Sequence, residues 1–170
     1  IQTPKVLMQS GVGDETELQR FGIPVLQHLP GVGRNFQDHV AFDCVWEYQT
    51  ALAPRNNMSE AILFGTTSAS LARPDLFVCQ AEVPKTTPEN AARFGMPSAG
   101  WTLFGAVAHP QSRGRLRLTG PLPEDQVRIE ANTLCERADF LAAMRCVELC
   151  REIGNSAPLR SFVKREVMPG

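Results

Sequence analysis

The sequence predicts an α+β fold, in which a mainly antiparallel sheet with flanking helices follows a segment of helices and loops. Beyond about residue 40 the chain carries several short runs rich in β-branched and aromatic residues, joined by links that contain proline and glycine. These runs are followed by one longer segment whose apolar residues recur at helical spacing. Strands followed by a long helix are typical of α+β domains.

The first predicted element is a short helix over residues 5–9. Thr3 and Pro4 suit the N-cap and the first helical position, because proline lacks only an N–H group that the start of a helix leaves unbonded. Gly11 suits the position after the helix, since glycine adopts left-handed backbone conformations without steric cost. We therefore expect a helix that starts at Thr3 and Pro4 and ends before Gly11.

A second short helix is predicted after Asp14. Asp14 and Glu17 form a D-x-x-E pattern that is similar to a capping box, in which side chains bond the free N–H groups of the first turn. Gly22 then ends the helix. Residues 23–29 are expected to be extended, and the glycines and proline of residues 30–33 predict a turn.

The strand candidates share short length, β-branched or aromatic content and flanking turn residues. They lie at residues 39–50, 61–64, 76–81, 101–108, 115–119 and 127–131. The proline-rich span 84–100 is expected to be irregular, with one helical turn at 89–94. A long helix is predicted over 138–153, and Ser156-x-Pro158 could start a second short one. The predicted apolar stripe of the long helix consists of Phe140, Ala143, Met144, Val147, Cys150 and Ile153.

Charge and composition exclude two classes of partner. Seventeen basic and eighteen acidic residues give a formal charge of −1, which is not the basic footprint of a nonspecific nucleic-acid or anionic-membrane binder. We therefore expect no nucleic-acid partner. No apolar run approaches the ~18 residues of a transmembrane helix, so we expect no transmembrane segment, and the start of the sequence shows no signal-peptide pattern.

Cysteine usage indicates a reducing environment. The five cysteines, Cys44, Cys79, Cys135, Cys146 and Cys150, are scattered and form no C-x-x-C pair. An odd count argues against a disulfide framework, so we expect free thiols and a cytoplasmic location. Cys146 and Cys150 could offer two thiolates to a metal, but no other residues complete four ligands. We interpret them as packing residues and expect no metal site.

Three arginines alternate along one predicted strand. Arg113, Arg115 and Arg117 would share one face, with Leu116 and Leu118 on the other. Such a basic strip could contact an anion or RNA. A solvated outer face fits the near-zero net charge better, and this is our interpretation.

Three stretches carry a specific resemblance. Residues 3–13, TPKVLMQSGVG, end in S-G-aliphatic-G after T-P and aliphatic residues; residues 29–39 read LPGVGRNFQDH, and residues 112–118 read SRGRLRL. They resemble the second signature, the following L-P-G-V-G-x-N-L-Q-D-H block and the start of the C-terminal region of the glucose–methanol–choline (GMC) family of flavin oxidoreductases. The resemblance covers nearly the whole chain. Within the family, the chain most resembles choline-dehydrogenase-like alcohol dehydrogenases.

The resemblance implies two domains and a cofactor. Residues 1–40 would be the C-terminal part of an FAD-binding domain, and residues 41–170 an incomplete substrate-binding domain. FAD would be the cofactor of the parent enzyme, which would oxidise the CH–OH group of a primary alcohol by hydride transfer to the flavin, with a histidine as the base. The implied cofactor-binding candidates are Ser10, Gly11, Gly13, Asn35, Asp38 and His39. The two glycines would let a ligand approach the backbone closely.

In the family, one face of the substrate-domain sheet also roofs the flavin pocket. Trp46, Trp101 and Phe104 are interpreted as residues that pack on a sheet face. Because the sequence does not tell which face each side chain occupies, a substrate-facing role for some of them stays open.

Two parts of the family's machinery have no counterpart in these residues. Neither residues 11–13 nor residues 31–33 continue as the G-x-G-x-x-G fingerprint that places a pyrophosphate at a helix N-terminus. His28, His39 and His109 do not stand in the family's H-x-x-G-T block. We expect an internal fragment without a catalytic residue, which neither retains FAD nor oxidises alcohols on its own. The alternative is a stand-alone, non-catalytic β-sheet module that binds a ligand or a protein.

The expected partner is the missing Rossmann portion of the same parent chain. Without it, apolar side chains of the first forty residues would lose their contacts: Val6, Leu7, Met8, Leu18, Phe21 and Ile23. Large exposed apolar patches tend to find another surface, so we expect self-association.

Overall fold

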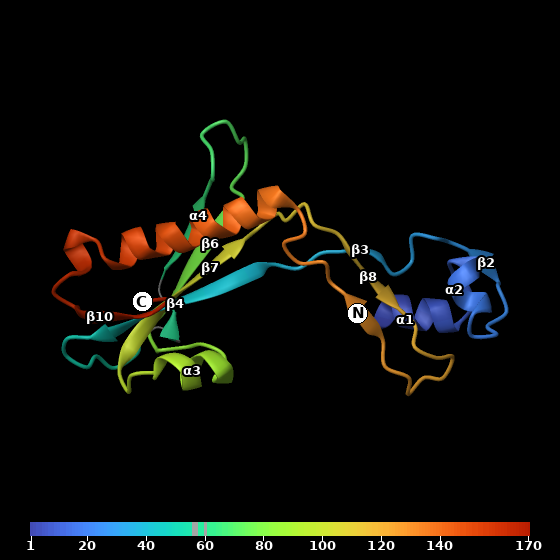
Figure 1. Ribbon diagram of the computed structural model, residues 1–170, viewed down its shortest axis with the longest axis horizontal. Helices are drawn as coiled ribbons and strands as arrows, with labels where there is room; N and C mark the ends of the chain where they lie inside the picture. The colour runs from blue at the N-terminus through green and yellow to red at the C-terminus, as the bar shows by residue number, and fades with distance from the viewer. Residues whose placement is uncertain (56–57, 60) are drawn as a thin grey trace. The chain divides into compact units, whose positions relative to one another are not determined.

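A computed structural model describes residues 1–55, 58–59 and 61–170 (Figure 1). The chain divides into two compact units. One unit combines residues 1–38 with residues 110–136, and the other combines residues 39–109 with residues 137–170. The assignment of residues 1–40 and 41–170 to two functional domains stays a prediction.

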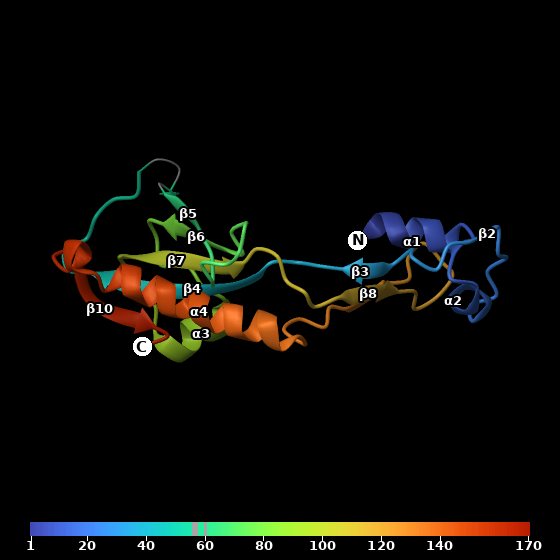
Figure 2. The same cartoon turned by 90° about the horizontal axis from the view of Figure 1, so that it is seen from above.

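The first unit contains small sheets and two short helices. Its elements are α1 (Gln2–Gln9), β1 (Val12–Gly13), α2 (Glu15–Gln19), β2 (Gln27–His28), β3 (Arg34–Phe36), β8 (Gly114–Arg117) and β9 (Arg128–Glu130). Strands β1 and β2 pair in parallel, and β3, β8 and β9 form an antiparallel sheet with β8 in the centre. Figure 2 shows α1 beside β3 and β8. Residues 112–118, predicted to belong with the long strands, thus pack with the N-terminal segment.

The two helices of this unit start differently from each other. Asp14 caps α2 as predicted, since its carboxylate accepts the backbone N–H groups of Thr16 and Glu17 at 3.1 and 3.3 Å. The predicted start of α1 is wrong, because the helix begins at Gln2 and Ile1 is its N-cap. Pro4 still lies in the first turn, where its missing N–H has no partner to lose.

Apolar side chains of the N-terminal segment form a small core. Met8, Leu18, Ile23 and Leu118 are buried together. The expectation that Met8, Leu18 and Ile23 lose their contacts is therefore wrong, because these side chains pack on one another and on Leu118, which directly follows β8. Val6 and Leu7 do remain exposed.

The second unit is a five-stranded antiparallel sheet with helices. Its elements are β4 (Val40–Tyr48), β5 (Ile62–Gly65), β6 (Leu76–Ala81), α3 (Pro88–Phe94), β7 (Gly100–Val107), α4 (Arg137–Gly154), the 3-10 turn η2 (Ala157–Leu159) and β10 (Val163–Met168). The strand order is β10-β4-β7-β6-β5. The predicted α+β fold with a mainly antiparallel sheet is confirmed. Strand β10 was not predicted.

Helix α4 lies along one face of this sheet (Figures 1 and 2). It approaches closely because Gly105 has no side chain: a Cβ there would lie 2.7 Å from the Sγ atoms of both Cys146 and Cys150. The predicted apolar stripe is wrong in part, since Phe140 and Met144 are exposed. Only small side chains fit so close to β7, and the buried positions are Asp139, Ala142, Ala143, Cys146, Cys150 and Gly154.

The register of the strands assigns each side chain to one of two faces. Trp46 pairs with Trp101 on the face that α4 covers, and Asp43 pairs with Phe104 on the opposite face. The opposite face is covered at one end, where Val45 packs against Phe94 at the end of α3. We call the rest of it the open face, and its aromatic side chains are Phe64, Phe77 and Phe104.

Candidate functional site

The first predicted site residues lie where α1 ends. Ser10 is the exposed C-cap of α1, and Gly11 follows with a φ of +85°. Gly13 is buried in β1, which pairs with β2. This turn carries the chain from the helix into the short parallel ladder, so the S-G-aliphatic-G motif forms a helix-to-strand connection.

Each glycine of this connection has a structural reason within the chain itself. A Cβ on Gly11 would collide with the carbonyl oxygen of Pro24, and its positive φ already favours glycine. A Cβ on Gly13 would lie 3.1 Å from Cγ of Met8. The Cβ directions of both glycines therefore face protein atoms, and a contribution of this turn to FAD binding stays a prediction.

The remaining predicted site residues follow the turn at residues 30–33. Asn35 lies in β3 with a φ of 57° and an exposed side chain, and Asp38 is exposed at the end of the first unit. His39 begins the second unit, where its ring meets the Phe77 ring edge-on at a centroid distance of 5.1 Å. The structure thus brings Ser10, Gly11, Gly13, Asn35 and Asp38 into one compact unit and His39 into the other.

Ion pairs hold the surface of the first unit together. Arg34 bonds the N-cap Asp14 at 3.2 Å, and Arg117 bonds Glu17 at 2.8 Å. Backbone hydrogen bonding from Glu17, together with Arg34, holds the pKa of the Asp14 carboxyl below its ordinary value. The ion pair between Glu17 and Arg117 therefore connects α2 to β8.

The alternating arginines form no basic strip. Arg115 pairs with Glu130 on β9, Arg117 pairs with Glu17, and Arg113 donates to the carbonyl oxygens of Pro110 and Ser112. Each guanidinium thus has partners within the chain. A role in binding RNA or another large anion is not supported by this arrangement.

His28, another of the three histidines, also has a structural role. Its Nδ1 accepts the backbone N–H of Glu15 at 3.2 Å. The imidazole thereby satisfies a free donor in the first turn of α2. This hydrogen bond gives His28 a structural role that involves no catalysis.

The open face of the large sheet carries a connected group of aromatic rings. Phe77 is central: its ring centroid lies 5.1 Å from His39, 6.5 Å from Phe64 and 6.3 Å from Phe104. Phe64 is 62% exposed. Exposed apolar surface of this kind is typical of a face that contacts a ligand or another protein surface. Trp46 and Trp101, by contrast, are buried on the α4 side, as expected for packing residues.

Two charged residues adjoin these rings, and sequence reasoning missed both. Asp43 lies opposite Phe104, and its buried Oδ1 has no hydrogen-bond partner among the described residues. Burial raises the pKa of the Asp43 carboxyl, while the positive charge of Lys85 and a hydrogen bond with Thr86 oppose the rise. The Lys85 ammonium lies 5.2 Å from the centroid of the Phe104 ring. The sequence signal for Asp43 was a single carboxylate within an otherwise mainly apolar strand.

The described residues contain neither a candidate membrane span nor a candidate metal site. None of the helices within that part of the chain is long and apolar enough to cross a membrane. No group of three or more histidine, cysteine or acidic side chains in the same ranges is placed to hold a metal ion. The described ranges therefore offer neither feature as a candidate site.

Comparison with known proteins finds oxidoreductases that match the whole chain. The chain is 33% identical to choline oxidase of Arthrobacter globiformis over 178 residues, which cover all of this chain and 32% of the relative. It is 29% identical to an alcohol dehydrogenase [acceptor] of Pseudomonas putida, covering all of this chain and 35% of that protein. No family model matches the chain. The chain spans about a third of the length of the curated relatives it matches.

Solved structures share the fold. The chain superposes on pyridoxine 4-oxidase from Mesorbium loti with a TM-score of 0.89 at 28% identity, over all of this chain and 34% of that one. A formate oxidase has a TM-score of 0.83 at 18% identity, over 99% of this chain and 38% of that one. The second likeness shows the fold alone.

Proposed function

We propose that the chain, which matches these oxidoreductases along its whole length, belongs to the glucose–methanol–choline family and forms the substrate side of an FAD-dependent enzyme that oxidises the CH–OH group of a primary alcohol. The observation that carries this proposal is the open face of the sheet. Its aromatic rings are left uncovered by α4, and Asp43 and Lys85 adjoin the Phe104 ring. The two sequence relatives are named for choline and for alcohols, and the chain matches them along its whole length.

The open face suits contact with the carbon skeleton of a small alcohol. Phe77 and Phe104 offer flat apolar surfaces that exclude water, and an alcohol's carbon atoms can pack against them. Asp43 and Lys85 lie at the side of these rings, where a hydroxyl group could bond either charged group. This arrangement binds and orients a substrate without itself supplying a base.

The contribution to cofactor binding is secondary in this proposal. FAD, when bound in the parent enzyme, supplies the hydride acceptor. The glycines of the first unit face their own chain, which leaves exposed side chains such as Ser10 and Asn35 to make surface hydrogen bonds. Such contacts orient an isoalloxazine or ribityl group weakly, and the phosphate-binding turn would come from the Rossmann portion of the parent.

The isolated chain is inactive in this proposal. It lacks the H-x-x-G-T histidine, and loss of a general base typically costs ~10²–10⁴ in rate even where a cofactor stays bound. The proposed location is the cytoplasm, which the unpaired cysteines suit. Exposed apolar residues such as Val6 and Leu26 support self-association of the chain.

A chimera tests the proposal. The 170-residue chain replaces the matching segment of choline oxidase, and flavin content and alcohol oxidation are measured. The chimera is expected to hold FAD and to oxidise at least one primary alcohol. Phe104→Ala should raise KM about 3- to 10-fold with flavin content unchanged, because truncation removes apolar contact with the substrate. Phe140→Ala, on the exposed side of α4, is the matched control and should change neither value.

Two outcomes would contradict the proposal. One is a flavin-loaded chimera in which Phe104→Ala and Phe140→Ala behave alike. The other is a folded chimera, judged by its circular dichroism spectrum, that holds no flavin under any loading condition. The second outcome would favour a stand-alone binding module.

A further inference from the structure

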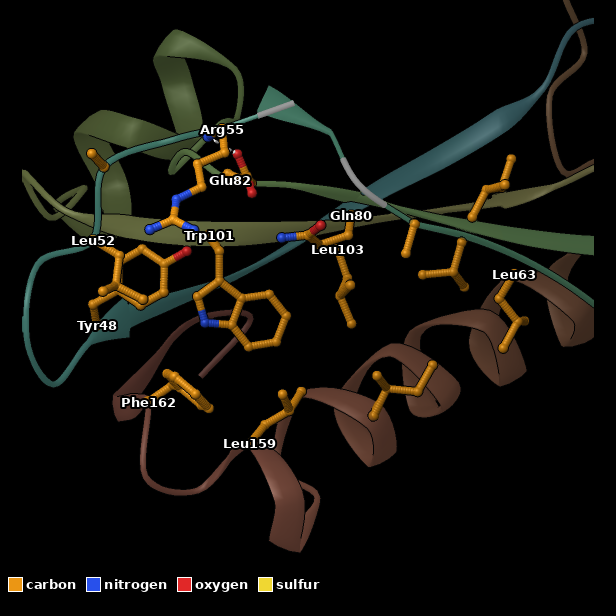
Figure 3. Close-up of a pocket in the computed structure, with 15 residues that line it drawn as sticks. Tyr48, Leu52, Arg55, Leu63, Gln80, Glu82, Trp101, Leu103, Leu159 and Phe162 are labelled. Carbon is orange, nitrogen blue, oxygen red and sulfur yellow. Dashed lines mark hydrogen bonds between the residues drawn. The ribbon is translucent and has the colours of Figure 1, made fainter. Parts of the chain in front are cut away.

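A cavity lies in the same unit, on the side of the sheet opposite the open face. It has a volume of about 720 Å³ and is lined by residues of β4, β5, β6 and β7, by described residues of the loop between β4 and β5, by the end of α4 and by the chain that follows (Figure 3). This volume is within the range of small-molecule sites. Trp101 and Leu103 form its floor on β7, whereas Phe77 and Phe104 point to the open face.

The lining of the cavity differs between its two ends. Figure 3 shows Arg55, Tyr48 and Trp101 at one end and Leu63 at the other, with Gln80 between them. The walls are mainly apolar, since leucine, isoleucine, valine and aromatic side chains supply most of the lining. A ligand that matches this surface has an apolar body and a polar group at one end.

Trp101 presents a hydrogen-bond donor that nothing in the described chain uses. Trp101 is 5% exposed, and its buried Nε1 has no hydrogen-bond partner among the described residues. Its stacking partner Trp46 differs, because the Nε1 of Trp46 donates to Asn155 at 3.2 Å. A buried donor without an acceptor costs free energy, so an acceptor that reaches it recovers that cost. In Figure 3 the Nε1 atom is on the side of the ring toward Phe162, which is 48% exposed.

The charges around the cavity nearly cancel. The carboxylate of the buried Glu82 accepts the backbone N–H of Arg55, and the Arg55 side chain lies at the same cavity end. One negative and one positive group leave no net positive charge to attract an anion. An anionic ligand would also bring its charge toward Glu82 at low dielectric, which is unfavourable. The amide of Gln80, which lines the cavity between its two ends, can donate to or accept from a neutral group.

We propose that this cavity is a second binding site, independent of the proposed catalytic function, for an uncharged apolar molecule that carries a carbonyl acceptor. The carbonyl oxygen accepts from Trp101 Nε1 and the apolar body packs along Leu103 toward Leu63. The site lies on the face that α4 covers, so its occupancy does not depend on FAD or on an alcohol substrate.

Indole N–H signals of the 170-residue chain give a direct test, since the protein has two tryptophans. Three probes of similar shape are compared in ¹⁵N-labelled protein: 2-acetylnaphthalene, 2-ethylnaphthalene and 2-naphthoate. The ketone is expected to shift one indole N–H downfield, as a new hydrogen bond does, and the Trp101→Phe variant assigns that signal by its loss. The hydrocarbon should bind about 3- to 10-fold more weakly, which matches one hydrogen bond, and the carboxylate more weakly still.

Variants distinguish binding at the proposed site from nonspecific binding to exposed apolar surface. Trp101→Phe keeps the stacked ring and should reduce ketone affinity about 3- to 10-fold while leaving hydrocarbon affinity unchanged. Phe140→Ala, which alters an exposed apolar residue elsewhere on the unit, should change neither affinity. Equal affinity for ketone and hydrocarbon, a preference for the carboxylate, or no shift of the Trp101 signal at saturating ketone each overturns the proposal. A shift that depends on protein concentration instead would show that a second copy fills the cavity, and this also overturns it.

Discussion

Trp46 and Trp101 stack on neighbouring strands with ring centroids 4.7 Å apart and an interplanar angle of 18°, yet among the described residues only the indole of Trp46 has an acceptor for its N–H. The stacked pair joins β4 to β7 beneath α4. Trp46 also contacts the helix end, because Gly154 lies directly against its ring. The pair therefore combines one fully satisfied residue with one that retains a donor for another use.

Removing the two N–H groups separately should differ in cost. Trp46→Phe loses the bond to Asn155 and part of a fully buried ring, so the free energy of unfolding should fall by about 1–3 kcal/mol. Trp101→Phe also loses part of a buried ring but removes a donor that has no acceptor among the described residues, so its free energy of unfolding should fall by less. Urea unfolding measures both. A larger loss for Trp101→Phe than for Trp46→Phe would contradict the assignment of the two indoles.

The contact of α4 with the sheet requires glycine at Gly154. A Cβ at this position would overlap the Trp46 ring, so Gly154→Ala should destabilise the second unit by about 1–3 kcal/mol through overpacking. Gly65→Ala is the matched control, because its Cβ would make ordinary contacts at 3.4 and 3.8 Å. Thermal unfolding compares the two variants. Similar midpoints for both would show that the helix is farther from Trp46 than described.

The N-cap of α2 should make the first unit sensitive to acid. The folded pKa of Asp14 is lowered, so its stabilisation is full above the ordinary value of 3.8 and is lost as the pH falls through the folded pKa. Asp14→Ala should cost about 0.5–2 kcal/mol at neutral pH. Asp14→Asn keeps a capping oxygen but cannot titrate, so it should retain most of the stability and lose the acid dependence. Amide exchange of residues 15–19 between neutral and acidic pH measures this, and an unchanged acid dependence in Asp14→Asn would refute it.

The five cysteines should be free thiols that differ in reactivity. Cys135 is exposed and should react first with a thiol-specific dye. Cys79 should react more slowly, because burial raises its pKa and reduces the thiolate fraction. The buried Cys44, Cys146 and Cys150 should react only after unfolding. An intact-mass measurement without reductant tests the pairing, and a loss of two hydrogen masses would reveal a disulfide.

The sequence alone predicts those helices and strands whose side chains repeat at the spacing of the element. Strands β4, β6 and β7 were predicted nearly at their observed bounds, because β-branched and aromatic residues alternate there. Strand β10 was missed, since Lys164 and Arg165 interrupt any apolar alternation. Both pair with Glu47 on the neighbouring strand, which is information from elsewhere in the chain. Strands β1 and β3 are too short to carry a pattern at all.

The orientation of α4 and the meaning of the glycines depend on tertiary packing. Phe140 and Met144 have the hydrophobicity of a buried stripe, but Gly105 brings the helix so close that small residues take the inner positions. Gly11 was predicted to allow ligand approach, whereas its space is occupied by Pro24. Asp43 shows the reverse case, because only the strand register reveals that its carboxylate is buried on the open face.

Flavin retention tests the central claim most directly, namely that this chain is the substrate side of a flavoenzyme and not its cofactor cradle. The purified 170-residue chain is incubated with excess FAD and desalted, and its visible absorbance is recorded. The account predicts a spectrum without flavin bands, since a few surface contacts cannot offset ordering costs of ~4–15 kcal/mol. Choline oxidase carried through the same steps is the positive control. Stoichiometric flavin bands from the isolated chain, together with dye reduction in the presence of a primary alcohol, would contradict the account.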